Sequence, residues 1–191
     1  MKIKSKDNTD NTNDKEILRI IRMEGDMNKG MKLLIITHQS SLYQHIRRMV
    51  SNHADADDVM QNVLVKVYRA IEKFESKSKL STWLYRIATN ETLTFLKKEK
   101  ERMKTTSRND TQLIELKADS YIEEGRIIMV LEKAISLLPE KQKLVFNMRY
   151  FDEMSYNEIS SVLQLTTGGL KASFHHAVKK IEAFIKENEI G

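Results

Sequence analysis

Polar residues near the C-terminus of the chain have the types and spacing that contact nucleic acid. Ser155 and Glu158 stand just before an apolar run, which predicts a capping box that starts a short helix. A turn over residues 164–169 follows, and a second helix begins after it. One face of this second helix is apolar and is formed by Leu170, Phe174, Ala177 and Ile181.

The opposite face of the second helix and its flanks are polar. Together with the residues that open the preceding helix, the candidates for DNA contact are Ser155, Tyr156, Lys171, Ser173, His175, His176 and Lys179. A helix with one face fixed to a core and the other free to enter the major groove is the arrangement of a helix-turn-helix. A helical hairpin within a bundle would show the same periodicity, so the pattern leaves that alternative open.

The adjacent residues His175 and His176 raise the question of a metal site. Neighbouring residues on a helix point about 100° apart, and the sequence offers no further ligand beside them. The chain also has no cysteine, which excludes disulfides and cysteine-based zinc sites. We therefore expect neither a metal nor another cofactor.

A second group of candidates lies in the middle of the chain. The segment Ala54-Asp-Ala-Asp-Asp58 opens a predicted helix, and Gln61 follows one turn after Asp57. The apolar stripe of this helix is formed by Val59, Val63, Val67 and Ile71. Acidic residues in a first turn complement the helix dipole, and spacing alone favours this structural interpretation. The alternative is a docking patch for a basic partner, formed by Asp57, Asp58 and Gln61.

A further helix, predicted from about residue 81 to residue 98, carries the only tryptophan of the chain. Trp83, Arg86, Asn90 and Lys97 lie within about 60° of one another, beside the predicted buried stripe. That stripe is formed by Leu84, Ile87, Ala88 and Phe95. An aromatic ring among Arg and Asn side chains suits stacking on an unpaired base beside phosphate contacts. Packing of Trp83 against a neighbouring helix fits the pattern equally well.

Composition predicts an all-α fold of two small helical domains joined by a flexible linker. The 191 residues include one proline and six glycines, and Leu, Ile, Lys and Glu are frequent. Four parts are expected: a disordered arm (1–14), a helical domain (15–98) interrupted near Gly25 and Gly30, a polar linker (99–124) and a helix-turn-helix domain (125–191). Further helices are predicted over residues 55–74 and 126–138, and Pro139 opens another.

Several classes of function are not expected from this sequence. It has no nucleophile motif, glycine-rich phosphate loop or metal-ligand cluster, which argues against an enzyme. The first 14 residues lack the apolar segment of a secretory signal, and no run approaches the ~18 apolar residues of a membrane span. We expect a cytoplasmic protein without membrane insertion.

The distribution of charge limits how tightly the C-terminal domain alone binds DNA. Residues 126–191 contain nine basic and eight acidic side chains, so their net charge is +1, against +5 for the whole chain. Nonspecific DNA affinity scales with the number of phosphate charges that are neutralised. The isolated domain should therefore bind weakly, with further affinity supplied by a dimer partner or a larger assembly.

Four segments, in order, resemble the bacterial sigma-70 family and most closely its short extracytoplasmic-function type. They are Ala54-Asp-Ala-Asp-Asp-Val-Met-Gln61, Thr82-Trp-Leu-Tyr-Arg-Ile-Ala-Thr-Asn90, Leu138-Pro-Glu-Lys-Gln142 and Ser155-Tyr-Asn-Glu-Ile159. The resemblance covers about residues 30–98 and 126–185. It implies a dissociable initiation subunit that binds core RNA polymerase and promoter DNA, with an anti-sigma factor as a further expected partner.

The resemblance also implies roles for the candidate residues. Asp57, Asp58 and Gln61 would bind the beta-prime clamp helices, which differs from the interpretation that spacing alone favours. The loop around residues 76–80 and the helix after it would read and open the minus-ten element, through Ser78, Lys79, Trp83, Arg86 and Asn90. The C-terminal helix would read the minus-thirty-five element while its domain binds the beta flap. The linker would run towards the RNA exit path.

The chain departs from the family pattern at positions that bear on promoter choice. Ser76 and Leu80 stand where the family often has Gly and Phe. Ser173 and His176 stand where arginines are common, and Gly169 stands where Thr is common. Fewer cationic contacts predict weaker minus-thirty-five binding or a different sequence preference. The main alternative is a stand-alone helix-turn-helix regulator that binds operators as a dimer, although no dimerisation heptad is visible.

Overall fold

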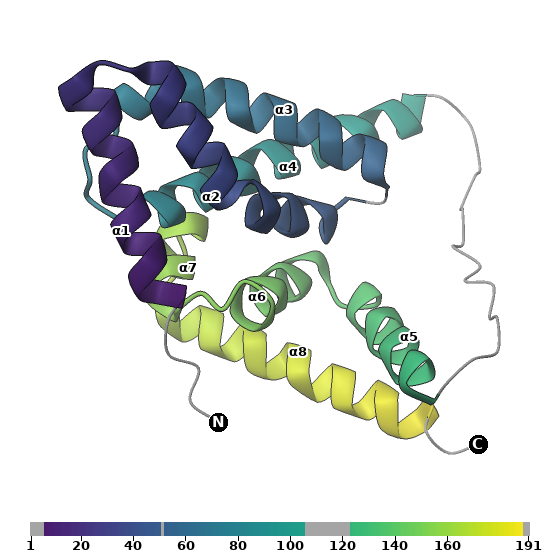
Figure 1. Ribbon diagram of the computed structural model, residues 1–191. Helices are drawn as coiled ribbons and strands as arrows, with labels where there is room; N and C mark the ends of the chain where they lie inside the picture. The colour runs from purple at the N-terminus through teal and green to yellow at the C-terminus, as the bar shows by residue number, and fades with distance from the viewer. Residues whose placement is uncertain (1–5, 51, 106–122, 189–191) are drawn as a thin grey trace. The chain divides into compact units, whose positions relative to one another are not determined.

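The chain is helical in the parts that the computed structural model describes, which are residues 6–50, 52–105 and 123–188 (Figure 1). Within these ranges no residue belongs to a strand, as the all-α prediction requires. The chain divides into two compact units, of which the first extends to Lys98 and the second begins at Glu99. Among the described helices, none is both long enough and apolar enough to cross a bilayer.

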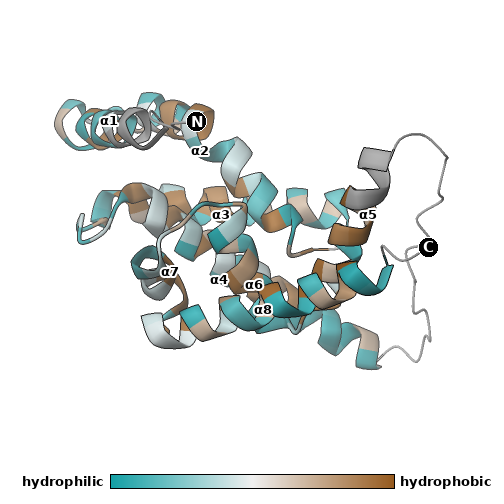
Figure 2. Cartoon of the chain, turned by 90° about the horizontal axis from the view of Figure 1, so that it is seen from below, coloured by the Kyte–Doolittle hydropathy of each residue, from teal (hydrophilic) through white to brown (hydrophobic). Residues whose placement is uncertain are grey.

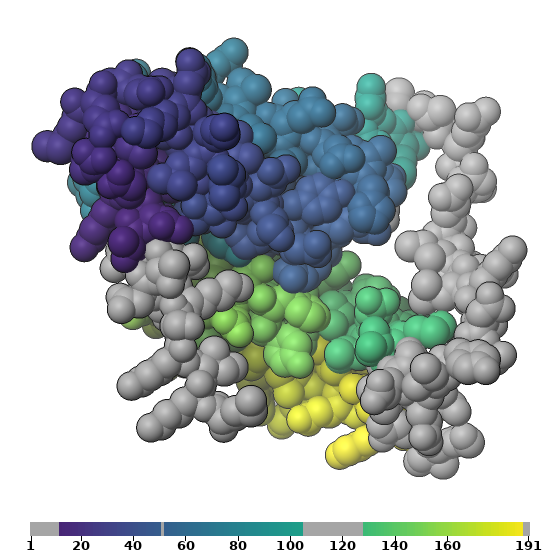
Figure 3. Space-filling view, in the orientation of Figure 1, coloured from purple at the N-terminus to yellow at the C-terminus, as the bar shows by residue number. Residues whose placement is uncertain are grey.

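Four α-helices and two short helical turns form the N-terminal unit. They are α1 (Lys6–Arg19), the π-helical turn η1 (Ile20–Glu24), α2 (Met27–Arg47), α3 (His53–Ala70), the 3-10 turn η2 (Ile71–Lys73) and α4 (Leu80–Thr105). Helix α2 packs against both α1 and α3, and the three helices share one face of the unit (Figure 3).

The break predicted at Gly25 is confirmed, whereas the break predicted at Gly30 is wrong. Gly25 has a φ of +70° and ends η1, and the side chain of Asp26 then accepts a hydrogen bond of 2.8 Å from the backbone N–H of Lys29. Gly30 lies inside α2 and is buried. A Cβ atom there would lie 2.2 Å from Cγ1 of Ile21, so the glycine lets η1 and α2 approach each other closely.

The predicted disordered arm is also wrong for residues 6–14, which lie in α1; residues 1–5 lie outside the described residues. Asp14 is only 7% exposed. Its carboxylate contacts Nε2 of His38 at 2.7 Å. The polar composition of this segment suggested disorder, but long-range hydrogen bonds fix its C-terminal end.

Helix α3 begins two residues before the predicted start near Asp55 and gives way to η2 before the predicted end at Phe74, but it has the predicted buried stripe. Asn52 caps it by accepting a hydrogen bond of 2.8 Å from the backbone N–H of Asp55. All four members of the i,i+4 stripe are at most 1% exposed: Val59, Val63, Val67 and Ile71. These residues join the core of the N-terminal unit, which leaves the acidic start of the helix in solvent.

The C-terminal unit contains α5 (Glu123–Ser136), α6 (Glu140–Tyr150), α7 (Tyr156–Leu163) and α8 (Thr167–Asn188). Pro139 precedes α6 as predicted. Helices α5 and α6 both pack against α8, and hydrophobic residues alternate with hydrophilic ones along α8 (Figure 2). Their shared core is formed by Ala134, Ile135, Leu138, Phe146, Ala177 and Ile181.

Two predicted boundaries need correction. Helix α4 continues to Thr105, so the N-terminal part of the predicted linker is helical, while residues 106–122 lie outside the described residues. The turn between α7 and α8 is shorter than predicted. Gln164 turns the chain with a φ of +55°, and α8 already begins at Thr167, before the two glycines.

Candidate nucleic-acid and partner interfaces

The loop between η2 and α4 consists of exposed residues held between two buried ones. Phe74 is 6% exposed and Leu80 is 2% exposed, whereas every residue from 75 to 79 is exposed. Ser76 has a φ of +57°, which a residue other than glycine rarely adopts. The predicted contact residues Ser78 and Lys79 therefore stand in solvent on a loop of defined conformation.

Trp83 lies in the core of the N-terminal unit and not among the exposed polar residues. It is 9% exposed, and its ring packs against Phe74 with centroids 5.1 Å apart. The prediction of a Trp side chain outside the buried stripe is wrong. Residues 80, 83, 84 and 87 follow helical i,i+3,i+4 spacing, so Trp83 extends the face that begins at Leu80. The alternative, packing of Trp83 against a neighbouring helix, is correct as to packing, but the contact is with Phe74, the residue that ends η2 and begins the loop.

Arg86 and Asn90 are exposed on α4, one turn apart. On the same helix Thr89 is buried and donates a hydrogen bond of 2.7 Å to the carbonyl of Tyr85. Its oxygen also lies 3.0 Å from Nε2 of buried His45 on α2. This network fixes the rotation of α4 against α2, so Arg86 and Asn90 stay on the outer face.

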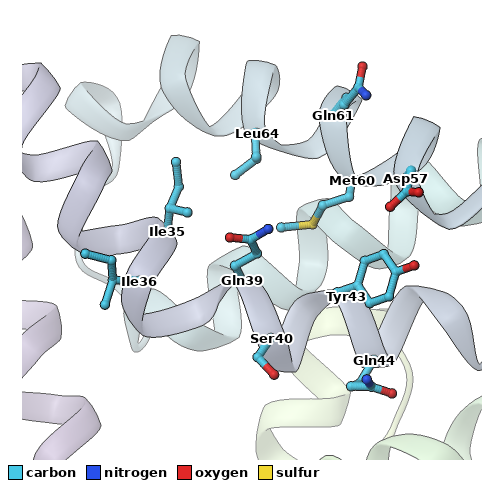
Figure 4. Close-up of a pocket in the computed structure, with 10 residues that line it drawn as sticks. All are labelled: Ile35, Ile36, Gln39, Ser40, Tyr43, Gln44, Asp57, Met60, Gln61 and Leu64. Carbon is cyan, nitrogen blue, oxygen red and sulfur yellow. The ribbon is translucent and has the colours of Figure 1, made fainter.

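The acidic start of α3 borders an open groove between α2 and α3 (Figure 4). Asp57, Asp58 and Gln61 are all exposed. The groove has a volume of about 730 Å³ and is lined by Ile35, Ile36, Gln39, Ser40, Tyr43, Gln44, Asp57, Met60, Gln61 and Leu64. Gln39 of α2 and Met60 of α3 face each other across it (Figure 4).

The α2 side of this groove was missed by sequence reasoning. Ile36 is 72% exposed, which is unusual for a large apolar side chain. The sequence does contain a signal, because Ile35 and Ile36 follow Leu34 directly. Three successive apolar residues on one helix cannot all face the core.

The predicted capping box at the start of α7 is confirmed. The backbone N–H of Glu158 donates to Oγ of Ser155 at 3.2 Å, and the backbone N–H of Ser155 donates to the carboxylate of Glu158 at 2.8 Å. On α8 the polar face also lies as predicted. Lys171, His175, His176 and Lys179 are exposed, whereas Ser173 is half-buried.

Tyr156 links α7 to the neighbouring helices through two cations. The guanidinium of Arg149, from α6, lies 5.4 Å from the centre of its ring, and Nζ of Lys171, from α8, lies 5.9 Å away. Arg149 also donates a hydrogen bond of 2.9 Å to the carbonyl of Met154. Sequence reasoning missed Arg149, although a cation in the last turn before a helix-turn-helix is a visible signal.

Both units present exposed polar side chains that other macromolecules can contact. Within the described residues, no group of three or more His, Asp or Glu side chains is placed to hold a metal ion. Exposed polar groups instead stand on well-packed helices in two separate units.

Comparison with known families identifies the class of protein to which the chain belongs. Residues 34–102 match the model of sigma-70 region 2, and residues 128–181 match the model of sigma-70 region 4. The two matches together span most of the chain and occur in the expected order. The chain therefore belongs to the sigma-70 family.

Characterised relatives place the chain in the extracytoplasmic-function type of that family. It is 27% identical over 164 residues to the ECF RNA polymerase sigma factor SigW of Bacillus subtilis, covering 81% of this chain and 88% of the relative. It is 25% identical over 169 residues to the ECF RNA polymerase sigma-E factor of Escherichia coli, covering 83% of this chain and 87% of the relative.

Solved structures share the fold. The sigma factor RpoE of Bartonella quintana, in complex with the anti-sigma factor NepR, aligns with a TM-score of 0.69 at 22% identity over 83% of this chain and 98% of that one. CnrH, in complex with the cytosolic domain of CnrY, aligns with a TM-score of 0.66 at 18% identity over 94% and 99%. The family matches and the curated relatives together show that the chain is a sigma factor that directs transcription initiation, and a stand-alone regulator would leave the region 2 match unexplained.

Proposed function

We propose that the acidic start of α3 binds the beta-prime clamp helices of core RNA polymerase. The observation that carries this proposal is the exposure of Asp57, Asp58 and Gln61 beside the groove between α2 and α3, within the segment matched to region 2. The apolar groove wall supplies area to bury, and the carboxylates favour a basic partner.

The loop of residues 75–79 and the exposed face of α4 read and open the minus-ten element. Ser78, Lys79, Arg86 and Asn90 are exposed and offer hydrogen-bond donors to bases and phosphates. Trp83 supports this surface from beneath by packing against Phe74. Direct stacking of Trp83 on a base would require the ring to leave the core.

Helix α8 reads the minus-thirty-five element in the major groove, while its domain binds the beta flap. The contacts come from the polar face of α8 and the start of α7: Ser155, Tyr156, Lys171, Ser173, His175, His176 and Lys179. Arg149 joins this set, because it and Lys171 both lie against the ring of Tyr156. With few cations available, most DNA affinity comes from the holoenzyme.

The chain works in the cytoplasm, where core polymerase is found, and catalyses no reaction of its own. An anti-sigma factor holds the free protein inactive by covering the polymerase-binding and DNA-binding faces. The exposed apolar side chain of Ile36 beside the groove supports a protein partner at that site.

A pull-down with purified core RNA polymerase tests the clamp contact. The Asp57→Ala/Asp58→Ala double variant should retain about a tenth or less of wild-type binding, since interface charge pairs are worth about 1.4 kcal/mol or more. The matched control is Glu72→Ala/Glu75→Ala, which removes two exposed carboxylates of the same unit just beyond the C-terminal end of α3. Failure of the folded wild type to bind core polymerase would overturn the proposal.

Promoter binding by the reconstituted holoenzyme tests the role of α8. Lys171→Ala should weaken binding by about fivefold to tenfold, the loss expected for one phosphate contact. Lys180 is an exposed lysine that lies about 180° around the helix, so Lys180→Ala is the control. Unchanged binding by Lys171→Ala would refute the contact.

A further inference from the structure

The loop of residues 75–79 is anchored at both ends by a segment that the region 2 model does not cover. That model matches residues 34–102, whereas the two anchoring side chains are Asp14 and Arg22. Both come from the α1–η1 segment, which sequence reasoning partly assigned to a disordered arm. Their contacts to the loop define a function for this segment.

Arg22 holds the N-terminal end of the loop. Its guanidinium donates a short hydrogen bond to the carbonyl of Phe74, and Nη1 lies 3.4 Å from Oγ of Ser76. The same guanidinium lies 5.9 Å from the centre of the Phe74 ring. One side chain therefore fixes the backbone at residue 74 and reaches the residue with the positive φ two positions later.

Asp14 holds the C-terminal end of the loop. Its Oδ2 accepts a hydrogen bond of 3.3 Å from the backbone N–H of Ser81, in the first turn of α4. The first N–H groups of a helix have no partner within the helix, so Asp14 caps α4 from a distant part of the sequence. The other oxygen, Oδ1, lies 2.7 Å from Nε2 of His38, which orients the carboxylate.

These contacts are more than general packing, because they act where the loop begins and ends. The residues between them are all exposed, so the loop has no core of its own to fix its conformation. The φ of +57° at Ser76 is a sparsely populated conformation that surrounding contacts must maintain. A loop that captures unpaired bases binds more tightly when it is ordered beforehand.

We propose that the α1–η1 segment positions the minus-ten-reading loop, with Arg22 and Asp14 as positioning residues for promoter selection. The inference rests on the minus-ten role proposed above. It adds a structural element outside the matched region 2 to the promoter-reading apparatus. Without the two anchors the loop samples other conformations, and discrimination between bases falls.

Fluorescence of the single tryptophan reports the anchor in the free protein. Trp83 packs against Phe74, whose carbonyl Arg22 holds. Arg22→Ala should shift the emission of Trp83 to longer wavelength and increase its quenching by acrylamide. Arg22→Lys keeps a cationic donor for the Phe74 carbonyl and should behave nearly as the wild type.

Arg19 provides the matched control. It lies one turn before Arg22 and is exposed, with its guanidinium paired to Glu16 and Glu24 at 2.8 Å each. The hydrogen bond from Arg19 lowers the pKa of Glu16. The ion pairs of Arg19 thus stay within the α1–η1 segment and do not reach the loop. Arg19→Ala should leave the Trp83 emission unchanged.

Promoter selection by the reconstituted holoenzyme tests the functional consequence. A duplex library randomised across the minus-ten positions is selected with the wild type, and the preference for the best base over the others is measured at each position. Arg22→Ala should lower that preference by about tenfold, the size of one charge-assisted hydrogen bond. Arg22→Lys should restore most of it, and core binding should be equal in all variants.

The outcomes separate this inference from the proposed function. If Arg22→Ala keeps the wild-type base preference, or loses core binding to the same extent, the positioning role is overturned while the minus-ten role stands. If the wild-type holoenzyme selects no minus-ten sequence at all, the proposed function fails and the inference falls with it. A Trp83 shift with a lowered preference, both rescued by Arg22→Lys, establishes the anchor.

Discussion

The N-terminal unit of this sigma factor has long-range polar side-chain contacts besides its local helix caps, whereas the capping contacts of the C-terminal unit are local. In the N-terminal unit, hydrogen bonds join Asp14 to Ser81, 67 positions away, and His45 to Thr89, 44 positions away. In the C-terminal unit, the capping bonds between Ser155 and Glu158 span three positions. The loop of residues 75–79, proposed to read the minus-ten element, thus depends on tertiary contacts, whereas the start of the helix-turn-helix is built from local ones.

This difference has consequences for stability. Removing one partner of a long-range buried pair lowers the free energy of unfolding strongly. The remaining polar group stays desolvated and has no hydrogen-bond partner. A local cap at a helix end is exposed on one side, so water replaces part of what is lost. Substitutions in the two units should therefore differ in cost even when each removes a single polar group.

The largest effect is expected for Asp14→Ala. It leaves buried His38 and the half-buried N–H of Ser81 without their acceptor, which costs about 3 kcal/mol in total. Urea unfolding followed by Trp83 fluorescence measures the N-terminal unit specifically, because the only tryptophan lies there. The exposed Asp57→Ala variant should lie within about 0.5 kcal/mol of wild type. Equal free energies of unfolding for the two variants would contradict the long-range role.

The contrast in distance also explains which features could be predicted from the sequence. Periodicity and spacing act within one helix, so the valine stripe of α3, the capping box and the polar face of α8 all agree with the structure. Nothing in the sequence around Asp14 or Arg22 indicates partners more than 50 positions away. The segment was therefore predicted partly as a disordered arm, and its contacts to the loop were missed.

Trp83 shows a second limit of sequence reasoning. Helical periodicity left its position ambiguous, since the residue falls at the border between the buried stripe and the polar face. The Trp83 side chain is buried because Phe74, which precedes the loop, supplies a ring for it to pack against. Side-chain partners across a turn are set by the tertiary fold, which the spacing of one helix does not contain.

Substitution of one glycine in each unit by alanine should change the free energy of unfolding in opposite directions. Gly30→Ala places a Cβ 2.2 Å from Cγ1 of Ile21 and should destabilise the N-terminal unit by about 1–3 kcal/mol. Gly168 lies in the first turn of α8 with no atom within 4 Å of an added Cβ. Gly168→Ala should therefore stabilise the C-terminal unit by about 0.5 kcal/mol, because alanine restricts the unfolded chain.

The Gly30 variant is followed by Trp83 fluorescence and the Gly168 variant by hydrogen exchange of amides in α8. A neutral Gly30→Ala would contradict a tight approach of η1 to α2. A loss of stability in Gly168→Ala would contradict an open N-terminal turn of α8.

An effect smaller than that of Asp14→Ala is expected for Ser155→Ala, which removes the local cap of α7. The loss should be about 1 kcal/mol, so amide exchange in α7 should speed up by about fivefold while Trp83 unfolding stays unchanged. Glu158→Gln keeps an acceptor for the N–H of Ser155 and should cost only a few tenths of a kcal/mol. A change in Trp83 unfolding for Ser155→Ala would mean that the cap is coupled to the N-terminal unit. The distinction between the locally built helix-turn-helix, proposed to read duplex DNA, and the loop held by tertiary contacts, proposed to read opened DNA, would then no longer hold.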